Sequence, residues 1–358
     1  MPRIEAARLQ AAAQRWTILC ALAGTMCATL SASPAPAKSA CGGCHPLESQ
    51  LQPKTPMGAA IELPGNQRLL EAHPHLTIES NGYTYRIERQ NGSSTYTVKD
   101  SSGALTLPVR YAFGANNQTF VLEYQGRFYE SLMSYYQSID GLAPTAGDER
   151  IRPHSLLEAM GRPLAIEEIT TCFGCHGTGG VTNGKLTLES LEPGITCVHC
   201  HQGVEAHSAA MTAGKKAPVP RKLGEMAAED MSNFCGQCHR TWEAVISQHL
   251  FGEVNVRFQP YRLANSKCFL GDDKRNRCTD CHNPHAELAR VDGAYDHVCL
   301  SCHRPSQGQT LVAGATQKPC TAGAKNCVDC HMPKVQQGEI TYTDHYIRVV
   351  HTGDPYPN

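Results

Sequence analysis

Apolar and polar residues alternate along several short segments between residues 80 and 136. These segments read YTYRIERQ, STYTVKD, LTLPVRYAF and TFVLEYQGRFYESLMSYY, and they are rich in β-branched and aromatic residues. Alternation with a period of two is typical of half-buried strands. Turn sequences separate the segments, with NGS beginning at Asn91 and SSG at Ser101. We therefore predict an antiparallel sheet or a small barrel in this region.

After Pro163 the pattern changes to short helical pieces. LAIEEIT, MAAEDMSNF and RTWEAVISQHLF carry apolar residues at helical spacing, and the last is the best candidate, with Trp242, Ile246 and Leu250 on one face. Gly and Pro are frequent between these pieces. The predicted fold class is α+β with low regular structure, in which a β-rich N-terminal insert precedes a region of short helices and loops.

The first 37 residues predict a secretory signal peptide. Three arginines precede an apolar run from Trp16 to Leu30, and SASPAPA then offers small-residue cleavage after Ala37. Export to the periplasm follows, with secretion or an outer-surface location as alternatives. A retained membrane anchor is the other interpretation of this segment. No later run reaches the eighteen apolar residues that indicate a membrane span.

One pattern, Cys-x-x-Cys-His, occurs seven times in the chain. Random placement of 18 Cys and 17 His in 358 residues predicts roughly 0.04 copies. We number these motifs one to seven in chain order. They are Cys41, Cys44 and His45; Cys172, Cys175 and His176; Cys197, Cys200 and His201; Cys235, Cys238 and His239; Cys278, Cys281 and His282; Cys299, Cys302 and His303; and Cys327, Cys330 and His331.

This spacing is typical of covalent haem attachment. Cysteines three apart on a helical turn point the same way, and the histidine lies one turn beyond the first cysteine. Two thiols can then bond the vinyl groups of one haem while the imidazole takes an axial position on the iron. We predict seven covalently attached haem c groups. Zinc sites would need paired motifs, and seven is odd; CxxC disulfides are redox motifs and seldom structural.

The spacing of the motifs suggests a division of the chain. Motif one precedes motif two by 131 residues, whereas the later steps are 25, 38, 43, 21 and 28. We predict an N-terminal single-haem segment at 38–62, a β-rich insert at 63–165 and a six-haem domain at 166–358. Aromatic content is only 6%, so the chain is expected to wrap its haems and to bury too little apolar surface to fold without them.

Ten histidines remain besides the seven that end the motifs, and bis-histidine ligation would need up to seven of them. His207 and His285 follow a motif too closely to reach the opposite face of the same haem, so each is predicted to cap a neighbouring haem. His345 and His154 are the next candidates. Weaker candidates are His73, His75, His249 and His351. His199 lies inside motif three and His297 just before motif six, and both are expected to face solvent or to hydrogen-bond haem propionates. Met57 is a further candidate for the first haem, although a packing role is the alternative.

Charge and the two remaining cysteines add further expectations. Without residues 1–37 the chain carries 29 basic and 32 acidic residues, a net charge of −3, and haem propionates make the protein more acidic. Nucleic-acid binding therefore has no support.

The basic segment KKAPVPRK is either a solvated loop or a site that docks an acidic partner or pairs with haem propionates. A disulfide between Cys268 and Cys320 is a hypothesis that an oxidising compartment permits.

The chain resembles a group of multihaem cytochromes c. CVDCHMPK, CTDCHNPH, CVHCHQGVEAH and TDHYI are similar to segments of cytochromes related to the tetrahaem partner of hydroxylamine oxidoreductase. The likeness covers residues 41–345 in layout and 172–345 in specific motifs. In that group, histidines placed like His207 or His285 are distal ligands to another haem. The resemblance implies electron transfer.

Two functions remain open from the sequence. The first is an electron carrier that exchanges electrons with redox proteins or a quinol-linked donor. The second is a reductase of a nitrogen or sulfur oxyanion, which would need one five-coordinate iron above a polar cavity. No motif has lysine in place of its histidine, and no haem site is distinguished by its sequence. We therefore favour the carrier and predict no catalytic residues, while the oligomeric state stays open.

Overall fold

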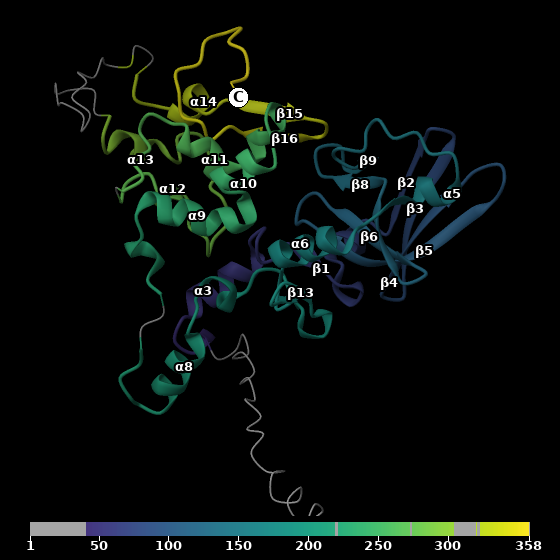
Figure 1. Ribbon diagram of the computed structural model, residues 1–358, viewed down its shortest axis with the longest axis horizontal. Coiled ribbons are helices and arrows are strands. Elements are labelled where there is room, and N and C mark those ends of the chain that lie inside the picture. The colour runs from purple at the N-terminus through teal and green to yellow at the C-terminus, as the bar shows by residue number, and fades with distance from the viewer. Residues whose placement is uncertain (1–40, 219–220, 273, 304–319, 321–322, 358) are drawn as a thin grey trace, which may run out of the picture. The chain divides into compact units, whose positions relative to one another are not determined.

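The computed structural model describes residues 41–218, 221–272, 274–303, 320 and 323–357. The predicted signal peptide lies outside these residues. The described chain combines helices with a curled antiparallel sheet, an α+β arrangement (Figure 1). Within these ranges, none of the helices has both the length and the apolar character that crossing a bilayer requires.

An eight-stranded antiparallel sheet contains half of the described strands. Its order is β10–β7–β6–β5–β4–β3–β2, and β1 pairs with β5. Among the described residues the two end strands are not paired with each other, so the sheet is open and the predicted small barrel is not formed. The strands are β1 (Ile61–Glu62), β2 (His75–Ser80), β3 (Tyr83–Gln90), β4 (Ser93–Lys99), β5 (Ala104–Phe113), β6 (Thr119–Tyr124), β7 (Arg127–Ser131) and β10 (Gly161–Pro163).

Asn-Gly turns and strict alternation explain why this segment forms a sheet. Asn81 and Asn91 each precede a glycine, and all four residues have positive φ. Two-residue turns of this kind match the twist of the strands they join. Alternate residues of β3 point inward, so that Tyr85 and Ile87 are fully buried. They pack in a hydrophobic core with Phe120 and other residues of the sheet. β8 (Met133–Tyr136) and β9 (Gly141–Pro144) form a separate hairpin.

One carboxyl group near this core predicts a pH-dependent stability. Burial, with the nearby Glu130 charge, raises the pKa of Asp148 to about 6, and its buried Oδ2 has no hydrogen-bond partner among the described residues. The folded state therefore binds more protons than the unfolded state from about pH 4 to pH 6, and this contribution to stability falls as pH rises through that range.

Asp148→Asn is expected to raise the free energy of unfolding at pH 7.5 by about 1 kcal/mol, after discounting for partial solvent screening. Thermal unfolding followed by circular dichroism at pH 7.5 and pH 4.5 would test this. The gain should shrink at the lower pH, because the wild-type carboxyl is then protonated. Glu79→Gln, at an exposed carboxylate on β2, is the control, and an equal gain in both variants would contradict the prediction.

Short helices dominate the chain after the sheet. α6 and α9 begin within the predicted helical pieces and extend through motifs two and four, which confirms those predictions. The helices are α3 (Pro46–Leu51), α4 (Arg68–Ala72), α5 (Leu156–Met160), α6 (Ile166–His176), α7 (Cys197–Cys200), α8 (Val204–Thr212), α9 (Ala228–His239), α10 (Trp242–Ser247), α11 (Gln259–Ala264), α12 (Cys278–Cys281), α13 (Asp296–Leu300) and α14 (Cys327–His331).

Shorter elements complete the described chain. They are η1 (Gln52–Lys54), η2 (Pro64–Asn66), η3 (Leu188–Ser190), η4 (Leu223–Glu225), η5 (Glu253–Arg257), β11 (Gly177–Thr178), β12 (Val181–Thr182), β13 (Lys185–Leu186), β14 (Glu192–Pro193), β15 (Lys334–Gln337) and β16 (Ile340–Thr343). β15 and β16 pair as an antiparallel hairpin that leads directly into the TDHYI segment.

The helix predicted at RTWEAVISQHLF is shorter and turned differently from the prediction. α10 ends at Ser247, and His249 has a positive φ of 53° that a helix cannot contain. Val245 is its buried residue, packed with Phe258 and Tyr261. Trp242, by contrast, is 46% exposed. The predicted apolar face was therefore wrong in its buried residue, because tertiary packing buries Val245 while Trp242 and Ile246 stay largely exposed.

Candidate functional site

One continuous cavity brings the seven motifs together. Its volume is about 3230 Å³, and every motif residue except Cys172 lines it. Pockets for a single small ligand are typically about 300–1,000 Å³, so this space suits several large groups. The distal candidates His207, His285 and His345 also line it, as do Met57 and His199.

Each motif is a turn of helix that presents its two thiols and its imidazole together. The histidine amide donates to the carbonyl of the first cysteine at 2.8 Å in motif one and at 2.9 Å in motifs three, five and six. Motifs two and four lie at the ends of α6 and α9, and motif seven forms the whole of α14. The i to i+4 spacing puts the side chains on one face, as two thioether bonds and one axial ligand to a single haem require.

Hydrogen bonds orient several of the imidazoles. His176 Nδ1 pairs with Ala60 O at 3.0 Å, and His331 Nδ1 pairs with Arg348 O at 2.8 Å. Two distal candidates follow the same pattern: His207 Nδ1 with Pro218 O and His345 Nδ1 with Thr343 O, both at 3.0 Å. A carbonyl partner makes Nδ1 the protonated nitrogen and leaves Nε2 free to bind a metal, as is usual for metal-binding histidines.

Burial also favours the neutral imidazole that a metal requires. Burial lowers the pKa of His176, His201, His239 and His282. Burial, with a contribution from the neighbouring His282, lowers the pKa of His345 to about 4. The chemistry of this donor set therefore fits axial ligation of haem iron at neutral pH.

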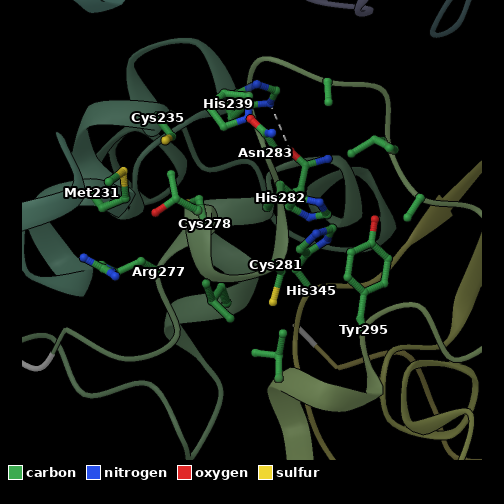
Figure 2. A pocket seen from close by; sticks show the side chains of 18 of the residues that line it. Met231, Cys235, His239, Arg277, Cys278, Cys281, His282, Asn283, Tyr295 and His345 are labelled. Atoms are coloured by element: carbon green, nitrogen blue, oxygen red, sulfur yellow. Dashed lines mark hydrogen bonds between the residues drawn. The ribbon is translucent and has the colours of Figure 1, made fainter. Parts of the chain in front are cut away.

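Two pairs of imidazoles face each other across the cavity. The ring centres of His201 and His285 lie 6.0 Å apart with planes 9° from parallel. Those of His282 and His345 lie 6.1 Å apart at 49°, and Figure 2 shows these two rings close together with Tyr295 beside them. Two imidazoles bound to one metal, with bonds of about 2 Å, place their ring centres roughly 6 Å apart. Both pairs match this separation.

Comparison with known proteins agrees with the motifs. No family model matches the chain. The outer cell wall cytochrome OcwA aligns with a TM-score of 0.49 at 15% identity over 89% of this chain and 80% of that chain, a likeness from which we draw nothing. The multiheme cytochrome MtrA of Shewanella baltica (strain OS185) is 27% identical over 185 residues. That match covers 44% of this chain and 48% of MtrA, about half the length of the relative.

The seven motifs and this similarity to a multiheme cytochrome support a multihaem c-type cytochrome family.

Cysteine side chains of neighbouring motifs contact one another. The thiol–thiol contacts are Cys41 with Cys197, Cys175 with Cys238, Cys235 with Cys278, and Cys299 with Cys327. Cys200 lies close to both cysteines of motif four. Motif five reaches the helix of motif six through Tyr295, whose ring lies 5.5 Å from that of His282. Every motif therefore neighbours at least one other.

Motif one stands apart in the sequence but not in the structure. Gln52 Nε2 donates to Ile195 O at 2.5 Å, and Ile195 N donates to Met57 O at 2.9 Å. These bonds join the segment after motif one to the segment that leads into motif three. The long sequence gap between motifs one and two is taken up by the sheet, which returns the chain to the cavity.

The remaining histidines divide into two groups. His199 lines the cavity and burial lowers its pKa, so the expected solvent-facing position is not observed, while propionate bonding stays a prediction. His154 is exposed beside α5 and does not line the cavity. His73 instead contacts Tyr135 Oη at 3.3 Å in the sheet region. Also outside the cavity lining, and exposed, are His75, His249, His297 and His351.

The structure also bears on the predicted disulfide and on the basic segment KKAPVPRK. Cys268 and Cys320 are both free thiols, so the predicted disulfide is wrong; Cys268 lies instead near the cysteines of motif six. In the KKAPVPRK segment, Arg221 and Lys222 line the cavity while Lys215 and Lys216 are exposed. Arg221 and Lys222 therefore lie where they could form ion pairs with haem propionates.

Sequence reasoning missed the residues that support the candidate ligand histidines. Gln259 Oε1 lies 3.3 Å from Nδ1 of His239, and Tyr295 lies beside His282. Arg262 is completely buried and pairs with Asp344, the residue before His345. No local sequence pattern identifies these residues, because their partners lie far along the chain. The one local signal is the TDHYI segment, in which Asp344 directly precedes His345.

Proposed function

We propose that this cytochrome is an exported seven-haem electron carrier that relays electrons between redox partners. The observation that supports it best is that all seven motifs line one continuous cavity and that each neighbours another motif. Bound at these motifs, haem c supplies one-electron iron chemistry. The chain's own part is to hold the attachment sites in contact, so that none is isolated from the rest.

In this proposal each motif histidine is an axial ligand of its haem iron. A second, distal histidine ligand is assigned at two sites. His285 would be the distal ligand at motif three, opposite His201, and His345 the distal ligand at motif five, opposite His282. The stretch CTDCHNPH would then serve two irons, with His282 at one and His285 at the other. His207 lines the cavity with an oriented ring and is proposed as a ligand at a further site. We propose no role in ligation for His154.

Redox proteins or a quinol-linked donor are the proposed partners, in the periplasm or at the outer surface. A net charge of −3 without the signal peptide, made more negative by propionates, favours partners with basic docking surfaces. The alternative, a reductase of a nitrogen or sulfur oxyanion, needs an iron with an open position above a polar cavity. The paired imidazoles at motifs three and five favour the carrier instead.

Two measurements on the purified mature protein test this proposal. Its intact mass should equal that of residues 38–358 plus seven haems, and reductive titration should consume seven electrons per molecule. Replacing Cys172 and Cys175 by alanine should reduce both counts to six, because motif two can no longer form thioether bonds. A colourless protein, or the mass of the bare chain, would refute the proposal. Substantial carbon monoxide binding by the reduced wild-type protein would favour the reductase.

A further inference from the structure

A buried charge network lies behind the proposed distal ligand at motif five. Arg262 of α11 has a side-chain exposure of 0%, as has Asp344. Its Nε and Nη2 each donate to one Asp344 carboxylate oxygen at 2.8 Å. Nη1 donates to Asn255 Oδ1 at 3.1 Å and to Pro357 O at 2.9 Å. A buried pair is stable only when its remaining donors are satisfied in this way.

The network holds a short segment, residues 344–348, at several points. Asp344 also accepts from Tyr346 N at 3.0 Å and from Arg348 Nη1 at 2.6 Å. Ser266, just after α11, accepts from Ile347 N at 2.8 Å through its hydroxyl oxygen. Tyr346 lies with its ring 5.4 Å from the Arg262 guanidinium carbon. The segment has no regular secondary structure of its own, so these contacts define its path.

This one segment reaches two attachment sites. His345 faces His282 of motif five, with ring centres 6.1 Å apart. Arg348 exchanges two hydrogen bonds with His331 of motif seven: its carbonyl oxygen pairs with Nδ1 at 2.8 Å, and its amide donates to His331 O at 3.1 Å. A displacement of the segment would therefore alter the surroundings of both histidines at once.

We propose that Arg262 is a positioning residue that couples two haem sites, by fixing residues 344–348 so that His345 meets the iron at motif five while Arg348 orients His331 at motif seven. The inference rests on the proposed ligation by His345 and His331. Arg262 touches neither of these histidines through any contact described above, and it acts through Asp344. Partners that orient a metal ligand typically affect affinity about 10- to 100-fold.

The test compares Arg262→Met and Asp344→Asn with wild type, His345→Ala and the control Arg89→Met. Arg89 is also a nearly buried arginine, 6% exposed, but it pairs with Glu71 beside the sheet. Carbon monoxide titration of the fully reduced proteins and potentiometric titration of all haems provide the readouts, with intact mass to count the haems.

Arg262→Met should keep seven haems, bind up to about one more carbon monoxide than wild type and shift the potentials of two haems. His345→Ala should gain the same binding but shift mainly one potential, and Arg89→Met should shift none. Arg262→Lys, which keeps the charge, should restore part of the wild-type behaviour. If Arg262→Met fails to fold, carbon monoxide titration and potentiometric titration of Asp344→Asn and Arg262→Lys test the proposal instead.

The inference would be overturned if the Arg262 and Asp344 variants kept seven haems and showed the same spectra and potentials as wild type. Failure of His345→Ala to gain any carbon monoxide binding would instead contradict the proposed ligation itself. The two failures are therefore distinguishable.

Discussion

Replacing His345 by alanine is expected to give the reduced protein about one additional iron that binds carbon monoxide per molecule. His345 is half-buried, its Nδ1 is paired with Thr343 O, and its ring is separated from that of His282 by the distance that two ligands of one iron would have. Alanine removes the imidazole without offering another ligand. The iron held by His282 then has an open position, which carbon monoxide can occupy after reduction.

Difference spectra of the reduced protein, with and without carbon monoxide, would measure this change. His345→Met should keep the iron six-coordinate and raise the potential of one haem, which separates loss of a ligand from general damage. His75→Ala removes an exposed histidine of β2 and should behave as wild type. If His345→Ala bound no more carbon monoxide than His75→Ala, a different group would be the ligand at motif five.

Removing all haem attachment is expected to unfold the helical region while leaving the sheet folded. The largest hydrophobic core, which includes Tyr85, Tyr96 and Phe120, belongs to the sheet and the elements packed on it. In the region after motif three, the described hydrophobic cluster contains only Val245, Phe258 and Tyr261 as buried members. So small a cluster cannot offset the conformational entropy lost when that region orders.

A variant with the fourteen motif cysteines replaced by alanine would test this expectation. Far-ultraviolet circular dichroism should lose the helical signal almost completely and retain β-sheet signal. Limited proteolysis should leave a protected fragment near residues 61–163. The singly changed Cys320→Ala, at an exposed cysteine outside the motifs, is the control and should keep the full spectrum. Retention of native helix content in the fourteen-cysteine variant would contradict the role given to haem in folding.

Much of the fold was predictable where the physical signal is local. Alternation from Tyr83 to Gln90 and the Asn-Gly turn at Asn91 predicted strands, and the strands formed there. The helices that carry motifs two and four also formed. The choice between a sheet and a small barrel stayed open, because strand-end pairing depends on residues distant in the sequence. The shorter α10 was not predicted, because the burial of Val245 depends on such residues as well.

The same distinction applies to the candidate site. The motifs were identified from the sequence alone, because two cysteines and a histidine within five residues must share a helical turn. His285 and His345 were predicted as distal candidates, but the histidine that each faces was not. His154 was also predicted, and the structure does not bring it to the cavity. The residues next to a histidine in the sequence do not predict which distant histidine it will face in the folded chain.

The sequence by itself determined where covalent attachment can occur, since thioether and axial bonds at one haem need only the i, i+3 and i+4 geometry of a single turn. It also determined the sheet, because alternation and turn residues act within a few positions. Only the tertiary structure decided that His285 faces His201, that motif one joins motif three, and that Arg262 reaches Asp344 across 82 positions. These contacts join segments that come together only when the chain has folded.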